Sequence, residues 1–172
     1  MPSNLLIRSE TPADIDAIHD VTVAAFQAMP YSSHTEQYII EELRAANALA
    51  VSLVAERDDR LVGHIAFSPV IVSDGSQGWY GLGPVSVLPE YQRQGIGKAL
   101  VEEGLARLRN IGAKGCCLVG HPEYYVKFGF RNMPELVYEG VPPEYFFVLL
   151  LGGNAPQGTV TFHEAFLTER PS

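Results

Sequence analysis

Cysteine is scarce in this chain, and the only two cysteines, Cys116 and Cys117, are adjacent. Neighbouring side chains leave a strand on opposite faces, which disfavours a disulfide between them. A metal site built on cysteine needs more ligands than these two provide. The pattern therefore predicts buried free thiols, a reducing cytoplasmic environment and no metal.

Basic residues and long apolar runs are also in short supply. Twelve Lys and Arg stand against twenty Asp and Glu, a formal net charge of −8. This balance argues against nucleic acid or an anionic membrane as a partner and suits a cationic substrate. No apolar run is long enough to span a bilayer, and the segment Met1 to Asn4 has neither a basic stretch nor a cleavable apolar one. We expect neither a membrane partner nor a targeting signal.

The length and the order of elements predict one α/β domain over residues 1–172. Thr11 and Pro12 mark one helix start, and Ser33 with Glu36 forms a capping-box pattern at a second. A third helix follows Gly97, and a brief one covers residues 123–128. Apolar runs and turn signals predict seven strands, which are Leu5 to Arg8, Ala50 to Glu56, Leu61 to Val72, Trp79 to Val87, Gly115 to Val119, Tyr145 to Leu151 and Thr159 to Phe166.

The segment Val85 to Leu100 holds the clearest functional pattern. A strand end, Val-Ser-Val, is followed by Gln92-Arg93-Gln94-Gly95-Ile96-Gly97 and then by a helical stripe. The first N–H groups of a helix are unpaired and lie at the positive end of its dipole, and glycine lets a phosphate approach the backbone. The dinucleotide fingerprint fails because Leu100 occupies its third glycine position. The Walker loop fails because Ala99 follows Gly97-Lys98.

A second motif, Tyr125-Val126-Lys127-Phe128-Gly129-Phe130, lies about thirty residues further on, with a strand between. Together with Gln-x-x-Gly-x-Gly it resembles the GNAT N-acetyltransferase superfamily, and most of all its YhbS-like predicted bacterial members. The resemblance implies a single GNAT-like domain: a mixed, mostly antiparallel sheet of six to seven strands, flanked by about four helices. It also implies that the fourth and fifth strands, those ending at Val87 and Val119, splay apart.

The same resemblance implies acetyl-CoA as cosubstrate, without a metal. Backbone groups of Val85 and Val87 would pair with the pantetheine arm, with the Val87 N–H near the thioester oxygen. Tyr125 would protonate the departing thiolate. The pyrophosphate would lie on the loop residues Gln92, Arg93, Gln94, Gly95, Ile96, Gly97, Lys98 and Ala99.

The acceptor side is less well marked. Many relatives carry a Glu at the position of Gly81, so no carboxylate base can be carried over. The usual Asn that contacts the pantetheine arm also has no counterpart, since only His121 lies in that neighbourhood. The acceptor site is bordered by a loop and helix start whose candidate residues are Tyr31, His34 and Glu36, although capping and solvent exposure explain these residues better. We expect His64 to be a satisfied, half-buried histidine.

These patterns predict an N-acetyltransferase that moves an acetyl group from acetyl-CoA directly to a primary amine of a small molecule or peptide. We expect a monomer or a homodimer. Two alternatives stay open: a non-catalytic acetyl-CoA-binding sensor, and a structural interaction domain whose loop holds no ligand.

Overall fold

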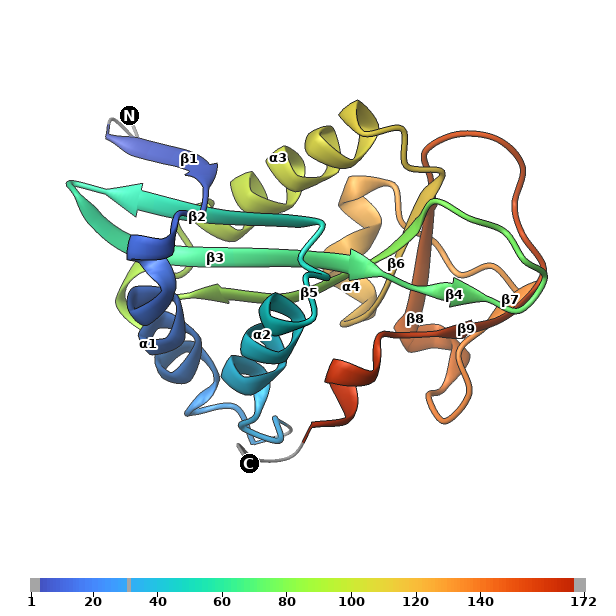
Figure 1. The fold of residues 1–172 in the computed structure, drawn as a ribbon, viewed down its shortest axis with the longest axis horizontal. Helices are drawn as coiled ribbons and strands as arrows, with labels where there is room; N and C mark the ends of the chain where they lie inside the picture. Colours follow the sequence, from blue (N-terminus) through green and yellow to red (C-terminus); the bar gives the residue numbers. More distant parts are fainter. Residues whose placement is uncertain (1–3, 31, 169–172) are drawn as a thin grey trace.

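A six-stranded mixed sheet forms the centre of the computed structural model, which describes residues 4–30 and 32–168 (Figure 1). The order β1-β2-β3-β5-β6-β8 is antiparallel throughout, except that β5 and β6 are parallel. The expected mixed, mostly antiparallel sheet is thus confirmed. Its strands are β1 (Leu5–Ser9), β2 (Val51–Arg57), β3 (Arg60–Pro69), β5 (Trp79–Val87), β6 (Gly115–Val119) and β8 (Phe146–Leu150).

Helices cover both faces of this sheet. On one face lie α1 (Ile15–Phe26) and α2 (Glu36–Ala45), where Ile18 and Ile40 pack on Val54. On the other lies α3 (Ile96–Asn110), whose Gly104 meets the ring of Phe67. Successive strand residues point to opposite faces, which is why these strands are apolar on both sides. A short α4 (Pro122–Tyr125) and a 3-10 turn (Val126–Phe128) follow β6.

Strands β5 and β6 separate part of the way along. They pair from Trp79 with Gly115 to Gly81 with Cys117, and within the described residues no further pair joins them. On its other side β5 stays paired with β3 as far as Val87, across a bulge opposite the Gly83-Pro84 segment. The expected splay between the fourth and fifth predicted strands is therefore confirmed, and it leaves an open edge on β5.

A second, small sheet corrects two sequence expectations. The predicted strand Leu61 to Val72 is two strands, β3 and β4 (Ile71–Val72). The predicted strand Thr159 to Phe166 is shorter, because β9 (Gly158–Thr161) ends before a 3-10 turn (Glu164–Leu167) that the His163 ring caps by accepting the Ala165 N–H at 3.0 Å. In the small sheet β9 is the central strand, with β4 on one side and β7 (Leu136–Val137) on the other.

Of the two helix caps predicted from the sequence, the structure contains the one at Thr11 and lacks the one at Ser33. Thr11 caps the first turn, and its N–H and hydroxyl both donate to the Asp14 carboxylate, as the sequence predicts. The predicted capping box of Ser33 with Glu36 is wrong: α2 begins at Glu36 itself, after Thr35. Ser33 instead bonds Thr35 through their hydroxyls.

The two cysteines are buried and free, and they join different apolar clusters on the two sides of β6. Burial raises the pKa of both thiols, which keeps them protonated. Separately, none of the helices in the described ranges is both long and apolar enough to cross a bilayer.

Candidate active site

The open edge of β5 presents backbone groups in a regular row. Leu88 donates its N–H to the carbonyl of Val62 at 2.9 Å, and Val87 lies opposite Gly63. In an antiparallel pair, alternate residues bond the partner strand, so the N–H groups of Val85 and Val87 point the other way, into the gap beside β6. An extended ligand can pair with this edge as an added strand.

A compact loop connects that edge to α3. After a 3-10 turn (Pro89–Tyr91), the Gln92 side-chain amide donates to the Val87 carbonyl at 3.0 Å and so ties the loop to the strand end. Arg93 and Gly95 adopt left-handed backbone with φ of 65° and 86°. Gly95 is the N-cap of α3, where glycine takes this conformation without strain. The sequence prediction of a glycine turn leading into a helix is confirmed.

The first turn of α3 offers unpaired N–H groups. The earliest bond along this helix runs from the Ala99 N–H to the Gly95 carbonyl at 3.0 Å. The N–H groups of Ile96, Gly97 and Lys98 therefore precede the helical ladder. The N–H of Ala99, a predicted phosphate contact, is already bonded within the protein. A Cβ at Gly95 would meet no atom within 4 Å, so the space beside the turn is open to a ligand.

Three cationic side chains surround the loop. Lys98 forms an exposed ion pair with Glu102 at 2.9 Å, one turn along α3. Arg57, at the end of β2, donates to the side-chain oxygen of Gln94. Arg93 is exposed beside them. These three cationic side chains gather at the loop although the molecule as a whole carries a net charge of −8.

Two adjacent tyrosines lie on α4, which follows β6 on the other side of the gap. The Tyr125 ring lies over Gly120, where a Cβ would be 2.4 Å from its Cε2, and packs against Phe130. The Tyr124 hydroxyl reaches the first turn of α3 and lies 3.4 Å from the Cβ position of Gly97. Burial raises the pKa of Tyr124, as Glu102 also does, while Lys98 opposes the shift. The sequence favours Tyr125 as the acid, with Tyr124 only as its substitute, and gives no sign that Tyr124 contacts α3.

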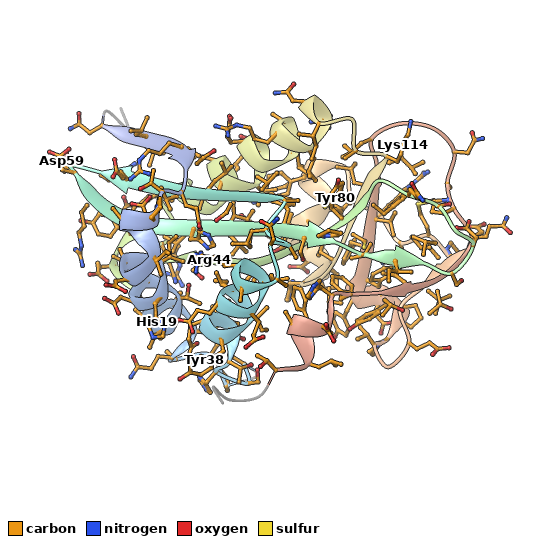
Figure 2. All side chains as sticks on the ribbon, viewed as in Figure 1. His19, Tyr38, Arg44, Asp59, Tyr80 and Lys114 are labelled. Carbon is orange, nitrogen blue, oxygen red and sulfur yellow. The ribbon has the colours of Figure 1, made fainter. Side chains whose placement is uncertain are left out.

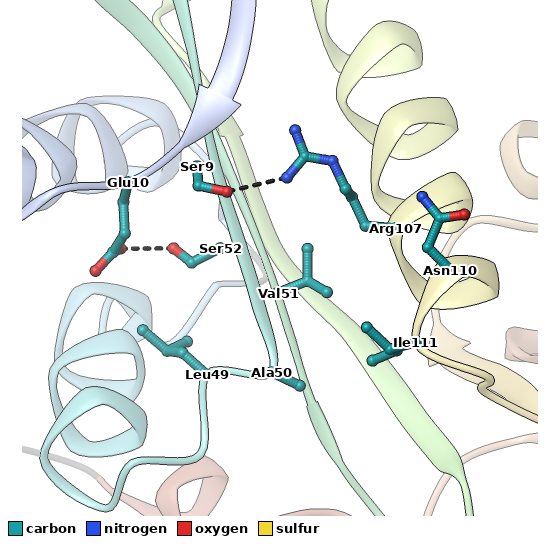
Figure 3. Close-up of a pocket in the computed structure, with 9 residues that line it drawn as sticks. All are labelled: Ser9, Glu10, Leu49, Ala50, Val51, Ser52, Arg107, Asn110 and Ile111. Atoms are coloured by element: carbon teal, nitrogen blue, oxygen red, sulfur yellow. Dashed lines mark hydrogen bonds between the residues drawn. The ribbon is translucent and has the colours of Figure 1, made fainter.

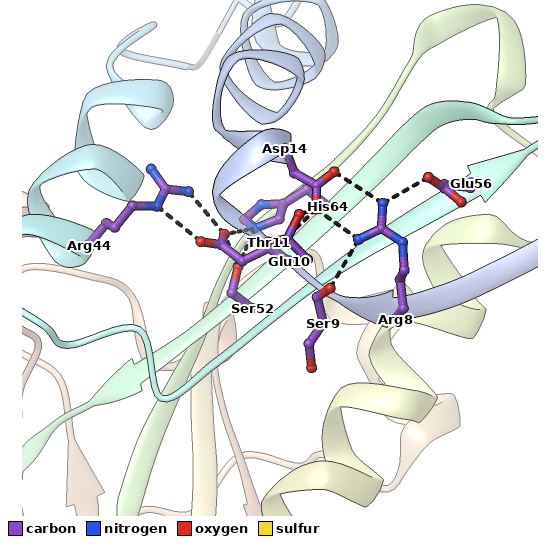
Figure 4. A network of polar contacts seen from close by, with 9 residues as sticks. All are labelled: Arg8, Ser9, Glu10, Thr11, Asp14, Arg44, Ser52, Glu56 and His64. Carbon is purple, nitrogen blue, oxygen red and sulfur yellow. Dashed lines mark hydrogen bonds and ion pairs between the residues drawn. The ribbon is translucent and has the colours of Figure 1, made fainter.

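A buried polar network lies on the α1 and α2 side of the sheet (Figure 4). His64 is fully buried, which corrects the half-buried expectation. Its Nε2 is 2.8 Å from the Ser52 hydroxyl, which donates to Glu10, and Arg44 binds the same carboxylate at 2.9 Å. The Nδ1 of His64 has no partner among the described residues, nor has the hydroxyl of Ser86, its neighbour across the strands. Burial lowers the pKa of His64 to about 4, so the ring is neutral at pH 7.

A cavity of about 360 Å³ lies away from the loop, where β1 ends beside the last turn of α3 (Figure 3). Its charged side chains are already paired: Glu10 with Arg44, and Arg107 with Glu103 at 2.8 Å. None of the predicted phosphate-loop residues lines it. The cavity is therefore separate from the predicted phosphate loop.

Comparison with known proteins identifies the family. The family model described as the acetyltransferase (GNAT) family matches residues 15–130. The chain belongs to the GNAT acetyltransferase family. It is 35% identical over 128 residues to the uncharacterized N-acetyltransferase YhbS of Escherichia coli strain K12, which covers 74% of each chain.

Two crystal structures of GNAT proteins are closely similar. A GNAT acetyltransferase from Brucella melitensis in complex with acetyl-CoA is 49% identical, with a TM-score of 0.85 over 94% of this chain and 97% of that one. YhbS from Escherichia coli in complex with CoA is 31% identical, with a TM-score of 0.88 over 96% of this chain and 93% of that one.

An aromatic ring occupies the space that a side chain at Gly81 of β5 would take. A Cβ at Gly81 would lie 2.5 Å from the Phe162 ring. Phe162 is held in turn by Tyr138 and Phe166, at centroid distances of 4.9 and 5.4 Å. A carboxylate at position 81 is therefore excluded by packing. The sequence alone shows that position 81 carries no acid, but it does not show that the Phe162 ring occupies the space.

The other predicted acceptor-side residues divide by role. One Glu36 oxygen accepts from Ser32 at 2.7 Å, while the other is buried without a partner in the described part of the chain. His34 is exposed. His121 caps α4 by accepting the Glu123 N–H at 3.4 Å. Tyr31 lies outside the described residues.

No group of three or more His, Cys, Asp and Glu side chains in residues 4–30 and 32–168 is arranged to hold a metal ion.

Proposed function

We propose that this GNAT protein transfers the acetyl group of acetyl-CoA directly to a primary amine. The observation that carries the proposal is the open edge of β5 leading straight into the unpaired N–H groups of α3. A thiol-terminated arm and a pyrophosphate need these two features side by side. The bound acetyl-CoA and CoA in the two similar crystal structures support the same ligand here.

The residues of the loop fit such a ligand. Gly95 leaves the space beside the helix start open, and a Cβ at Gly97 would make only an ordinary contact with Tyr124. Gly95 is required by its left-handed backbone, whereas the protein's own packing does not require glycine at position 97, and a phosphate against the backbone does. The amides of Ile96, Gly97 and Lys98 would bind the pyrophosphate, and Gln92 would hold the loop against Val87.

In this mechanism the chain supplies electrostatics and proton donation. Acetyl-CoA supplies the acetyl group as a thioester. The Val87 N–H donates to the thioester oxygen as negative charge develops there, and one such donor is worth on the order of 10²–10³ in rate. Tyr125 donates its phenolic proton to the departing thiolate, a role worth about 10²–10⁴.

The amine must lose a proton before it attacks, because an alkylammonium with a pKa near 10 is not a nucleophile. We assign the acceptor side to the segment around Glu36, one of whose carboxylate oxygens is buried with no partner among the described residues and can accept a proton or anchor an ammonium. The net charge of −8 favours cationic acceptors. The buried free thiols suit a reducing compartment such as the cytoplasm.

The phosphate loop is tested by Gly97→Asp, with Gly97→Asn as its neutral match. Both residues are tolerated near a helix N-terminus, so both variants should fold. The aspartate should weaken CoA binding in calorimetry by at least tenfold more than the asparagine, because only it places a carboxylate beside the phosphates. Equal affinity for CoA in the two variants would remove the assignment.

Catalysis is tested by Tyr125→Phe with detection of released thiol. We expect turnover to fall on the order of 10²-fold with CoA affinity kept, since the ring remains and only the acid is lost. A sensor, the second candidate, is favoured by the absence of a carboxylate at Gly81. It would bind acetyl-CoA yet release no CoA with any of a broad panel of amines.

A further inference from the structure

Tyr124 is the side chain that spans the gap beside the β5 edge. It starts from α4, after β6, and its hydroxyl ends 3.4 Å from the Cβ position of Gly97 on α3. The same Gly97 position is 3.9 Å from a methyl group of Val87. The hydroxyl therefore lies where the strand edge, the helix start and α4 come together.

The ring of Tyr124 is fixed by its neighbours. It meets Tyr125 edge-on with centroids 4.9 Å apart and contacts Phe128 at 5.5 Å. The Lys127 ammonium lies over its face, 4.0 Å from the centroid. These contacts hold a rigid aromatic side chain in one direction, so the hydroxyl meets a ligand without a large loss of conformational entropy.

The hydroxyl lies near charged groups at the start of α3, since Lys98 and its ion-pair partner Glu102 both act on the pKa of Tyr124. The amides of the first turn of α3 lie on one side of it. The Lys98 side chain is close enough to oppose the rise in the pKa of Tyr124 that burial causes. Because the phenol stays protonated at neutral pH, it is a donor there.

We propose that the Tyr124 hydroxyl donates a hydrogen bond to the pyrophosphate of CoA, opposite the amides of Gly97 and Lys98. This inference rests on the proposed function. The two neighbouring tyrosines then have different roles: Tyr124 binds the phosphates, while Tyr125 protonates the thiolate. Gly97 is then the residue whose missing side chain leaves room between the helix and the phenol.

Two ligands test the inference: CoA, and pantetheine, which lacks both the phosphates and the adenosine of CoA. Calorimetric affinities of CoA and of phosphate-free pantetheine are measured for the native protein and for Tyr124→Phe. The control is Tyr38→Phe, which removes a phenol from α2, on the other face of the sheet (Figure 2). Thermal unfolding of each variant verifies the fold.

We expect Tyr124→Phe to weaken CoA binding about tenfold, as for a lost hydrogen bond to a charged group, and to leave pantetheine binding unchanged. Tyr38→Phe should change neither. Full CoA affinity in Tyr124→Phe overturns the inference but leaves the proposed function standing. So does an equal loss for both ligands, which would mean that the ring packs on the pantetheine arm. A native protein without affinity for CoA would overturn both.

Discussion

At two single positions, Gly81 and His64, the structure adds what the sequence could not predict. Gly81 reads in the sequence as an absent acid, and the structure shows that Phe162 fills the volume beside it. His64 reads as a half-buried histidine, and it is fully buried with one ring nitrogen bonded and the other unpartnered in the described residues. In both cases the missing information was a partner far away in the sequence, which local patterns do not contain.

The packing at Gly81 predicts a cost for the smallest possible side chain. Gly81→Ala places a methyl group 2.5 Å from a ring carbon of Phe162, so the ring or the strand must move. We expect a loss of about 1–3 kcal/mol in the free energy of unfolding, measured by chemical denaturation. In a Phe162→Ala background the same change should cost little. An equal cost in both backgrounds would show that the ring is not the obstacle.

Buried neutral His64 predicts a pH dependence of stability. Its pKa is lowered to about 4 by burial, against about 6.5 in the unfolded chain, so the unfolded state binds more protons between these values. Stability is therefore full above pH 6.5 and is lost as the pH falls toward 4. The expected loss is about 2 kcal/mol between pH 7 and pH 5.

The measurement is denaturant unfolding at several pH values for the native chain and for His64→Gln, which cannot titrate. Arg44 and Ser52 lower the pKa of Glu10 from its ordinary 4.5, and Arg8 lowers that of Asp14 from 3.8, so these two carboxylates contribute only near and below the low end of this window. The variant should lose most of the slope, whatever its absolute stability. The same slope in both proteins would refute the assignment.

At the scale of elements, contiguous signals were predicted well and distant ones were not. The turn into α3 and its buried stripe of Ile96, Leu100 and Leu108 followed from local pattern, because a glycine cap and a 3.6-residue period are short-range properties. The small sheet was missed because its strands are only two to four residues long and pair across the chain. The contact of Tyr124 with α3 was missed for the same reason.

Helix α3 carries a glycine in its middle for a packing reason. A Cβ at Gly104 would lie 2.3 Å from the buried ring of Phe67. In an exposed helix Gly→Ala is stabilising by about 1 kcal/mol, but overpacking here costs about 1–3 kcal/mol. We expect Gly104→Ala to lower Tm by several degrees in calorimetry. Replacing the ring by a smaller side chain, in Phe67→Leu, should make Gly104→Ala tolerated. A raised Tm for Gly104→Ala alone would contradict the packing argument.

At the scale of the whole molecule, net charge and local charge oppose each other. A chain with a net charge of −8 repels an anion such as CoA, while Arg93 and Lys98 attract it at the loop. Salt screens both effects. At 0.1 M salt the Debye length is about 10 Å, so the attraction by nearby cations is screened less than the repulsion by distant carboxylates. The sign of the salt dependence therefore shows which of them dominates.

We expect CoA affinity to fall several-fold between about 0.05 and 0.5 M salt, because the local attraction dominates. Glu102→Gln gives a matched variant, since it frees Lys98 from its exposed ion pair at 2.9 Å without changing the size of the side chain. It should tighten CoA binding about two- to threefold at low salt, in line with the small worth of a surface pair, and steepen the salt dependence. Calorimetry at four salt concentrations measures both. An affinity that rises with salt would mean that the overall negative field outweighs the loop, and that backbone amides and Tyr124 carry the phosphate recognition without help from the cations.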